Sequence, residues 1–318
     1  MSNRKETVTV FGGSGFIGRH LVRRLAKTGV QIRIASRRPS QAAFLKTCGN
    51  VGQIVPIAVD ITCEDSVAAA VRGSDVVINL SGILVESRKW SFETVHADAP
   101  ARIARHATKI GARRFIHMSS LGANSASSST YARSKAAGDV NVLAAYPGVT
   151  IMRPGLVYGP EDTFFNQYAK VAQIAPALPL FGGGKTRFQP IYVGDVAEAV
   201  MAALADPNTQ GRTYELGGPR VYTFKELIVL LMKEIHASRP LISLPWIVGA
   251  IIGGVMEKLP NAFLSRDLVE LLKSDVVVND SALTMKDLGV EAAALETILP
   301  TYVDRFRPGG RFCRDQVA

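Results

Sequence analysis

The chain of 318 residues contains few cysteines and no apolar run long enough to cross a membrane. Cys48, Cys63 and Cys313 show neither metal-ligand spacing nor a paired framework, so we expect no metal site, no disulfide scaffold and a reducing compartment. The apolar stretch Leu241–Met256 has sixteen residues, whereas a membrane helix needs about 20. The first predicted strand begins near Thr7, which leaves little chain for a targeting peptide, so we expect a cytoplasmic protein or a processed form.

Acidic residues are in the minority. The 27 Asp and Glu against 37 Lys and Arg give a formal net charge of +10. The basic residues are scattered, with no aromatic-interleaved patch or nucleic-acid motif, so nucleic acid is not an expected partner. A cofactor with several phosphates accounts for part of the excess, and an anionic membrane or protein surface accounts for more. General solubility is the alternative explanation for the rest.

Strand-like and helix-like segments alternate through the first half of the chain. The predicted strands are Thr7–Phe11, Gln31–Ala35, Ile54–Ala58, Val76–Leu80, Arg114–Met118 and Val149–Arg153. The predicted helices are Arg19–Lys27, Ser66–Arg72, Ser91–Ile110 and Tyr131–Ala144. Such alternation predicts an α/β Rossmann fold, a doubly wound parallel sheet with helices on both faces. We expect a dinucleotide-binding core at 1–160 and a smaller, interleaved partner or substrate lobe at 161–318, from which segments at about 186–217 return to the core.

A glycine-rich turn follows the first predicted strand and leads into the first helix. Its residues are Gly12, Gly13, Ser14, Gly15, Phe16, Ile17 and Gly18. Glycine permits the tight backbone angles and the close approach of phosphates, and the helix N-terminus supplies N–H donors to a dinucleotide pyrophosphate. Such glycines alone also occur in purely structural loops. Their place between a strand and a helix predicts a dinucleotide site.

The end of the second predicted strand lacks the acidic residue that NAD-binding proteins place there to accept from the ribose 2′-hydroxyl. Ser36, Arg37 and Arg38 occupy this position. A carboxylate would repel a 2′-phosphate, whereas a guanidinium binds it through charge-assisted hydrogen bonds. The sequence therefore predicts NADPH in preference to NADH, with two solvated surface arginines as the alternative interpretation.

Tyr131 and Lys135 are four residues apart, which places them on one face of a predicted helix. An ammonium group beside a phenol favours the phenolate and lowers the phenol pKa, as acid–base catalysis requires. Ser119 or Ser120, at the end of the preceding strand, would hold a substrate oxygen next to that phenol. A Tyr–Lys pair alone is usually a surface feature. After the glycine turn and the two serines, it predicts a catalytic group.

Together these motifs resemble the short-chain dehydrogenase/reductase superfamily in its extended or atypical form, over nearly the whole chain. The resemblance assigns the glycine motif to Gly12, Gly15 and Gly18, and it implies a role for Lys135 in holding the cofactor ribose. It also implies further cofactor contacts: Asp60 and Ile61 near the adenine, Leu80, Ser81 and Gly82 after the fourth strand, and Pro154, Gly155 and Val157 beside the nicotinamide.

Three segments are closer still to the 39 kDa accessory subunit of respiratory complex I, the NDUFA-nine type, and its bacterial relatives. They are 117–123, 131–138 and 159–166. This resemblance implies a tightly held NADPH with a structural or regulatory role near the quinone end of the complex, and a sister group is associated with ubiquinone biosynthesis. We therefore expect an accessory factor of complex I or of quinone metabolism. The resemblance also implies a protein peripheral at the inner membrane, on the mitochondrial matrix side if the chain is a processed eukaryotic form.

One position departs from the extended pattern. His96 stands where these proteins usually carry an Asn that helps to hold a water in the proton relay, which argues against turnover. We interpret His96 as a packed or capping residue. Since Ser119, Ser120, Tyr131 and Lys135 are all present, an active NADPH-dependent oxidoreductase or epimerase is the alternative function.

Two features predict a partner surface. Leu241–Met256, which includes Trp246, is either a core helix or an apolar face offered to a membrane or a hydrophobic partner. The segment Arg305–Arg314 has four arginines and is predicted to be a loose basic tail. We expect the two together to contact complex I subunits or the membrane surface, with solvated alternatives for both.

Overall fold

The computed structural model describes residues 5–257 and 264–310, and the chain divides into two compact units. The first unit contains the chain up to Pro154 together with 193–216 and 279–291; the second contains 155–192, 217–278 and the chain from Ala292. The sequence indicates a return to the core near 186–217. The return at 279–291, where Leu283 bridges to Tyr214, has no comparable sequence signal.

A seven-stranded sheet forms the centre of the first unit. Its strands are β1 (Thr7–Phe11), β2 (Gln31–Ser36), β3 (Ile54–Ala58), β4 (Val76–Asn79), β5 (Arg114–Met118), β6 (Thr150–Pro154) and β11 (Thr213–Leu216). They pair in the order β11-β6-β5-β4-β1-β2-β3, and every pairing is parallel. The predicted doubly wound fold is confirmed. The strand order reverses between β1 and β4, and open α/β sheets bind ligands at the carboxyl ends of the strands beside such a switch point.

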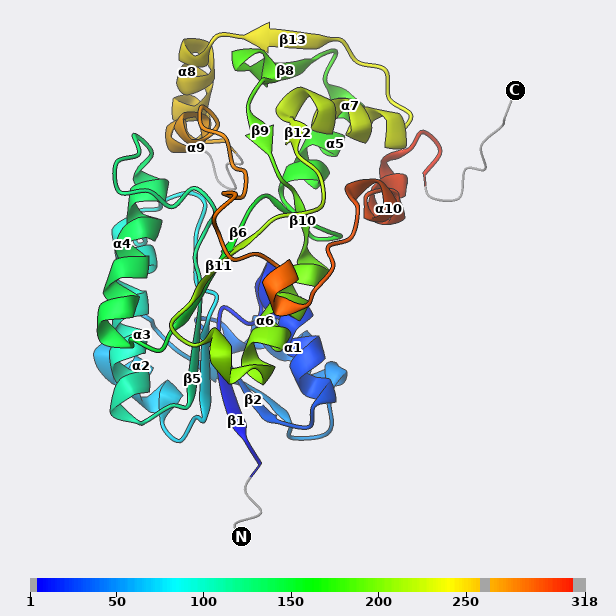
Figure 1. The fold of residues 1–318 in the computed structure, drawn as a ribbon. Coiled ribbons are helices and arrows are strands. Elements are labelled where there is room, and N and C mark those ends of the chain that lie inside the picture. Colours follow the sequence, from blue (N-terminus) through cyan, green and yellow to red (C-terminus); the bar gives the residue numbers. More distant parts are fainter. Residues whose placement is uncertain (1–4, 258–263, 311–318) are drawn as a thin grey trace. The chain divides into compact units, whose positions relative to one another are not determined.

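Helices cover both faces of this sheet (Figure 1). They are α1 (Phe16–Lys27), α2 (Glu64–Val71), α3 (Ala99–Lys109), α4 (Thr130–Ala145) and α6 (Val193–Ala205), with short 3-10 segments at Pro39–Cys48, Pro207–Thr209 and Lys286–Leu288. The helices α2, α3 and α4 pack one after another on one face, and α1 packs with α6 on the other. Buried Ile103, Val142 and Phe115 belong to the core cluster on the first of these faces. Parallel strands buried in this way read as nearly continuous apolar runs.

The predicted helix Ser91–Ile110 is interrupted, which corrects that expectation. A π-helical turn at Glu93–Asp98 precedes α3. Pro100 has no N–H, so the ordinary helical bond to the carbonyl of His96 cannot form. That carbonyl lies against Gly138 of α4, where an added Cβ would overlap it. The π turn and the glycine therefore bring α4 close to the segment that carries His96.

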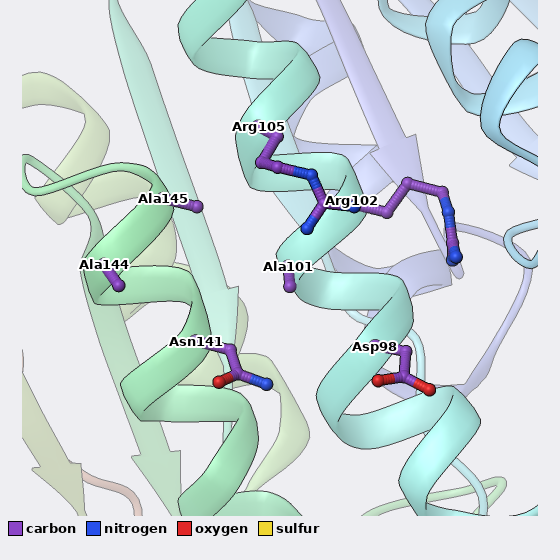
Figure 2. Close-up of a pocket in the computed structure, with 7 residues that line it drawn as sticks. All are labelled: Asp98, Ala101, Arg102, Arg105, Asn141, Ala144 and Ala145. Atoms are coloured by element: carbon purple, nitrogen blue, oxygen red, sulfur yellow. The ribbon is translucent and has the colours of Figure 1, made fainter.

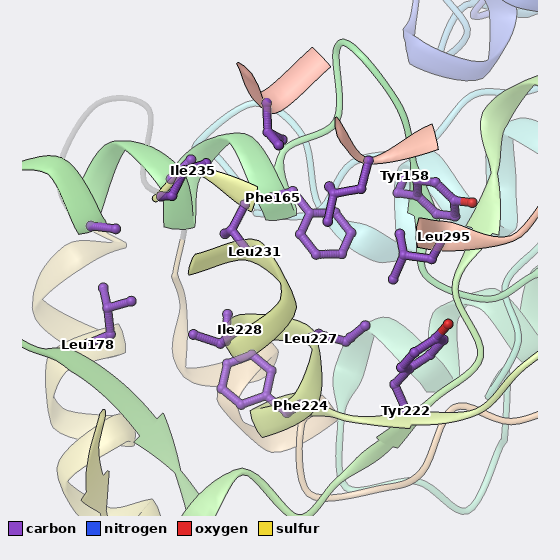
Figure 3. Close-up of a cluster of buried hydrophobic side chains, with 14 of the residues drawn as sticks. Tyr158, Phe165, Leu178, Tyr222, Phe224, Leu227, Ile228, Leu231, Ile235 and Leu295 are labelled. Carbon is purple, nitrogen blue, oxygen red and sulfur yellow. The ribbon is translucent and has the colours of Figure 1, made fainter. Parts of the chain in front are cut away.

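The second unit is built from short elements. They are β7 (Val157–Tyr158), α5 (Phe164–Ile174), β8 (Leu178–Phe181), β9 (Arg187–Phe188), β10 (Ile191–Tyr192), β12 (Tyr222–Thr223), α7 (Phe224–Glu234), β13 (Leu241–Leu244), α8 (Trp246–Met256), α9 (Arg266–Leu271), α10 (Leu295–Ile298) and α11 (Pro300–Val303), with 3-10 turns at Gly182–Gly184 and Asp304–Phe306. Its core gathers side chains of α5, α7 and α10, among them Phe165, Leu227 and Leu295 (Figure 3). A capping box between Thr223 and Glu226 begins α7.

Candidate dinucleotide and acid–base site

The glycine turn lies at the carboxyl end of β1 and is shaped by contacts that exclude side chains. Gly12 has a φ of 76°, and a Cβ there would lie 2.8 Å from the carbonyl oxygen of Leu80. A Cβ on Gly18 would overlap the Gly12 carbonyl, so the turn and the first helical turn of α1 touch through their backbones. Gly13 is buried against the side chains of Val10 and Ile34. The predicted reasons for glycine at positions 12 and 18 are both visible here.

The start of α1 fits a pyrophosphate. Gly15 is the N-cap residue, no side chain caps the helix, and its first turn contains no acidic residue. Gly15 is exposed, and Ser14, Phe16 and Ile17 are half-buried. The N–H groups at a helix N-terminus lack intrahelical acceptors and carry the positive end of the helix dipole. The residues present therefore fit a bound diphosphate held by the main chain.

The turn after β2 presents two exposed arginines. The Ser36 hydroxyl lies 3.3 Å from both the carbonyl oxygen and the N–H nitrogen of Arg38, donating to the first and accepting from the second. These contacts close a tight turn with Arg37 at its tip. The Arg37 guanidinium lies 4.7 Å from the ring centroid of Trp90. Asp60 follows β3, and hydrogen bonds from Thr62 hold the pKa of its carboxyl below the usual value. Ile61, beside it, is half-buried.

The loop after β4 lies beside the acid–base residues. Ser81 donates its N–H to Asn79 Oδ1 at 3.1 Å, and Ile83 donates its N–H to His96 Nε2 at 3.0 Å. A Cβ placed on Gly82 would lie 3.9 Å from Lys135 Nζ. Gly82 is thus near Lys135, and the predicted cofactor contacts of Leu80, Ser81 and Gly82 stay a prediction.

The phenol of Tyr131 lies among aromatic rings at the start of α4. Ser129 caps this helix by accepting from the Ala132 N–H. The Tyr131 ring meets the rings of His96 and Phe92 edge to face, at centroid distances of 5.2 and 5.6 Å. Burial raises the pKa of Tyr131, and a hydrogen bond with the Ser120 side chain opposes that shift. The structure brings Tyr131 and Ser120 together, as predicted.

Lys135 corrects one expectation. Its ammonium is buried and donates to the Met118 carbonyl at 3.0 Å. Desolvation lowers the pKa of Lys135 to about 8, with the charge of Asp139 opposing. The Tyr131 pKa is raised and not lowered, because burial of the phenol outweighs its other interactions. In the protein alone, the Tyr–Lys pair is therefore not poised as a phenolate.

His96 is held as a neutral, fully bonded group. It is buried, Nε2 accepts from the Ile83 N–H, and Nδ1 lies 2.9 Å from Ser134 Oγ, which donates to the Tyr131 carbonyl. These partners assign the proton to Nδ1. Burial lowers the pKa of His96 to about 3, and the Lys135 charge adds to this shift. His96 therefore ties the loop after β4 to α4, in agreement with the interpretation of a packed histidine.

A buried polar cluster around Asp139, one helical turn after Lys135 on α4, was not predicted from the sequence. Asp139 Oδ2 accepts from Arg153 Nε and Nη2 at 3.0 and 2.9 Å, and Asp139 Oδ1 lies 3.6 Å from His117 Nε2. Burial raises the pKa of Asp139 and lowers that of His117 well below its usual value. Ser119 Oγ is buried without a hydrogen-bond partner of good geometry among the described residues. The spacing of four between Lys135 and Asp139 was the available sequence signal.

The remaining predicted cofactor residues fall on both sides of a unit boundary. Pro154 ends β6 in the first unit, and its carbonyl accepts the Leu121 N–H at 2.8 Å. Gly155 and Val157 belong to the second unit, where Val157 pairs with Ile191. Their predicted contact with a nicotinamide stays a prediction.

A hollow of about 600 Å³ lies between α3 and α4 (Figure 2). Its lining residues are Asp98, Ala101, Arg102, Arg105, Asn141, Ala144 and Ala145. None of these is a predicted cofactor or catalytic residue. The small side chains Ala101 and Ala144 leave the space, and the hollow is separate from the glycine turn at which we expect the dinucleotide.

The apolar stretch Leu241–Met256 forms β13 and α8 and is not one helix. Helix α8 buries Gly249, Gly253 and Gly254, whereas Ile247, Ile251 and Val255 are 75, 61 and 63% exposed. The core-helix alternative therefore holds for one face only: Ile252 and Met256 pack in a cluster with Phe181, whereas the large aliphatic side chains of the other face point outward. Trp246 is half-buried, packing in a cluster with Phe181, Leu264 and Val269. In residues 5–257 and 264–310 no helix has the length and apolarity to cross a membrane.

The predicted loose tail is partly wrong. Arg307 Nε donates to the Glu234 carbonyl at 2.9 Å, and the Arg305 guanidinium contacts Asn166 and the Pro160 carbonyl. The first half of the segment is thus held on the second unit. Arg311, Cys313 and Arg314 lie outside the described residues. Within the described part of the chain, no group of three or more His, Cys, Asp or Glu side chains is placed to hold a metal ion.

A parallel sheet with a glycine turn at its switch point and a Tyr–Lys pair on a neighbouring helix defines a Rossmann protein of the short-chain dehydrogenase/reductase type. The model of the NAD dependent epimerase/dehydratase family matches residues 8–217. The chain belongs to this family, whose members use a nicotinamide dinucleotide.

Curated relatives include a mitochondrial complex I subunit. The chain is 37% identical to NADH dehydrogenase (ubiquinone) 1 alpha subcomplex subunit 9 of Arabidopsis thaliana, across 95% of this chain and 78% of that subunit. It is 32% identical to the ceramide reductase of Caulobacter vibrioides, across 65% of this chain and 63% of the reductase. The solved dTDP-glucose 4,6-dehydratase of Bacillus anthracis, in complex with NAD, shares the fold: its TM-score is 0.72 at 17% identity, covering 94% of this chain and 95% of that one.

Proposed function

We propose that this protein holds NADPH tightly and serves as an accessory factor of respiratory complex I or of quinone metabolism, with the cofactor in a structural or regulatory role. The similarity to a complex I subunit over nearly the whole chain supports the accessory role. The single observation that carries the choice of NADPH is the turn Ser36–Arg38, where two exposed arginines replace an acidic residue.

The residues divide the binding of the cofactor between them. The N–H groups at the start of α1 would hold the pyrophosphate, and Arg37 would bind the 2′-phosphate. Lys135 would face the ribose beside the loop of Leu80–Gly82, with Asp60 and Ile61 toward the adenine. When bound, the nicotinamide would supply hydride-transfer chemistry. Beside it, the phenol of Tyr131 would keep its proton, and His96 would keep its proton on Nδ1.

The state of the acid–base residues supports a structural role for the cofactor. The Tyr131 pKa is raised, Lys135 donates to a main-chain carbonyl, and His96 is neutral with both nitrogens bonded. The phenol and the imidazole are therefore not prepared to exchange a proton at neutral pH, and the Lys135 ammonium, whose pKa is about 8, is held by a main-chain carbonyl. A ligand at a hundred times its Kd adds about 2.7 kcal/mol to stability. Binding of the dinucleotide would therefore keep the first unit folded without turnover.

Calorimetry at fixed salt tests the cofactor. We expect NADPH to bind at least about tenfold more tightly than NADH, and Arg37→Ala to remove that preference while leaving NADH affinity unchanged. Arg113→Ala is the matched control, since Arg113 precedes β5 at the amino ends of the strands and pairs with Glu6. Equal affinities for the two dinucleotides would refute the assignment of the 2′-phosphate.

An active NADPH-dependent oxidoreductase or epimerase is the second candidate. The observation that favours it is the placement of Ser120 beside the Tyr131 phenol, together with the similarity to a ceramide reductase. Tyr131 would then act as acid or base, Ser119 or Ser120 would orient a substrate carbonyl, and Lys135 would lower the phenol pKa once bound cofactor rearranges the site.

Tyr131→Phe separates the two functions. The accessory role predicts unchanged NADPH affinity, unchanged melting temperature and unchanged quinone-linked respiration in cells that carry the variant. An NADPH-dependent reduction that is present in the wild type and lost in Tyr131→Phe would establish the enzyme instead.

We further propose that the outward face of α8 contacts complex I subunits or the membrane surface, which would place the protein at the inner membrane as a peripheral factor. An exposed aliphatic face of this kind is typical of interaction sites. Ile251→Glu should abolish flotation with liposomes without loss of stability, because Ile251 is mostly exposed. The matched control is Val140→Glu on α4, at an exposed position of the first unit. Equal flotation of Ile251→Glu and the wild type would exclude the membrane.

A further inference from the structure

A two-residue turn in the loop after β4 presents basic side chains. Ser87 donates its N–H to the Trp90 carbonyl at 2.9 Å, and Trp90 returns its N–H to the Ser87 carbonyl at 3.1 Å. These two bonds close a hairpin with Arg88 and Lys89 at its tip. Below the tip, Glu86 accepts the Phe92 N–H at 2.6 Å. The position of the hairpin is therefore set by hydrogen bonds on its own loop.

Two cations contact the Trp90 ring, one from the turn after β2 and one from the hairpin itself. Arg37, from the turn after β2, lies 4.7 Å from the ring centroid, and Lys89 Nζ lies 5.3 Å from it. Each distance is within the range of a cation–π contact. Because both cations lie close to the same ring, the distance between them is no more than about one Debye length at 0.1 M salt. Salt therefore screens their mutual repulsion only in part. An anion that contacted both charges would relieve this repulsion.

The surrounding acids do not balance these charges. Arg37, Arg38, Arg88 and Lys89 are all exposed, and none forms an ion pair with an acidic side chain in the part of the chain that the structure describes. Asp60 is close enough for Lys89 and Arg37 to lower the pKa of its carboxyl, but one of its oxygens already accepts both hydrogen bonds from Thr62. The carboxylates of Asp60 and Glu86 are thus outnumbered by the four cations of this cluster, and both already accept hydrogen bonds.

We propose that Lys89 and Arg37 together bind a phosphate monoester, the 2′-phosphate of the adenosine end of NADPH, and that Trp90 is the positioning residue that holds the two cations. This inference rests on the proposed cofactor and adds its selectivity determinants. A 2′-hydroxyl offers no charge to this cluster, whereas a 2′-phosphate dianion accepts from a guanidinium and an ammonium at once. Arg37 supplies a planar fork and Lys89 a compact charge from the opposite loop.

Titration of the full chain, freed of bound nucleotide, with adenosine 2′,5′-bisphosphate and with AMP tests the proposal. Lys89→Ala and Trp90→Leu should each weaken the bisphosphate about tenfold, change AMP affinity less than about twofold and flatten the salt dependence for the bisphosphate. Lys109→Ala, at the end of α3, is the matched lysine control and should change neither affinity. Trp90 is one of only two tryptophans, so its emission gives a second readout, which should respond to the bisphosphate and not to AMP.

The outcomes separate this inference from the proposed function. If the wild type prefers the bisphosphate, and Arg37→Ala removes the preference while Lys89→Ala and Trp90→Leu keep it, the hairpin has no part in selection. If Trp90→Leu weakens both ligands equally, Trp90 stacks on the adenine and the positioning role is wrong. If the wild type binds the two ligands equally, the choice of NADPH itself fails.

Discussion

Two helices of similar length, α1 in the first unit and α8 in the second, expose opposite kinds of side chain. Helix α1 buries Leu21, Val22 and Leu25 and exposes charged residues such as Arg23. Helix α8 buries its glycines and exposes Ile247, Ile251 and Val255. The first arrangement is that of a helix covering a sheet in water. The second leaves an aliphatic face exposed, and we propose that a partner outside the chain covers it.

The difference shows how each unit uses glycine. In the first unit, Gly12 and Gly18 bring backbone close to backbone at the turn for which we propose a phosphate site. In α8, Gly253 lets the helix approach the main chain at Ser265, and the Cβ of any other residue would lie 2.7 Å from that carbonyl carbon. Close packing there serves to anchor the helix with its large side chains turned outward.

Truncation of one aliphatic side chain on each helix gives the largest expected contrast. Leu25→Ala should lower the free energy of unfolding by about 3 kcal/mol, because Leu25 is buried and its removal leaves a cavity. Ile251→Ala should change it by less than about 0.5 kcal/mol. Urea unfolding followed by circular dichroism measures both. A large loss for Ile251→Ala would mean that α8 packs against its own chain.

Adjacent glycines on α8 sharpen the comparison. Gly253→Ala should destabilise the second unit by about 2 kcal/mol, since its Cβ would meet main-chain atoms. Gly254→Ala meets only the end of the flexible Arg266 side chain and should be neutral or stabilising by up to about 1 kcal/mol. The emission of Trp246 during unfolding follows this unit. Equal effects of the two substitutions would argue against the close contact at Ser265.

Acid should affect the first unit through His96. Its folded pKa of about 3 lies below the ordinary value of 6.5. The unfolded chain therefore binds a proton that the folded chain refuses, and stability that is present above pH 6.5 is lost as the pH falls toward 3. The loss should be about 1 kcal/mol per pH unit. His96→Asn should unfold with a shallower pH dependence over this interval, and a parallel dependence in variant and wild type would count against a buried neutral His96.

The sequence predicted the sheet of the first unit closely because strands such as β1 and β4 are buried, mainly apolar runs and the others are rich in β-branched or aromatic residues between helical segments. The predicted strands at Thr7–Phe11, Ile54–Ala58 and Arg114–Met118 have the same bounds in the structure. The π-helical turn at Glu93–Asp98 was not predicted, although Pro100 was its sequence signal. A proline in the first turn of a helix is usually tolerated, so Pro100 alone did not indicate a π turn. Only the structure shows that the freed His96 carbonyl packs against Gly138.

For the candidate site, the motifs predicted which residues come together but not their protonation. The pKa of Tyr131 is set by burial and that of Lys135 by desolvation, and both depend on packing that spacing in a helix does not specify. Asp139, His117 and Trp90 were missed for a similar reason, since their partners come from separate strands and loops. The outward face of α8 could not be predicted, because an evenly apolar sequence gives no period from which to assign a buried side.

The most direct test of the account is the identity of the nucleotide that the protein carries. The full chain is purified without added cofactor and denatured, and the released nucleotide is identified and quantified by liquid chromatography with mass spectrometry. We predict NADP(H), in near-equal amount to the protein, from the wild type and from Tyr131→Phe alike, and a strong loss from Arg37→Ala. Release of NAD(H), or of no dinucleotide at all, would contradict a tightly held NADPH.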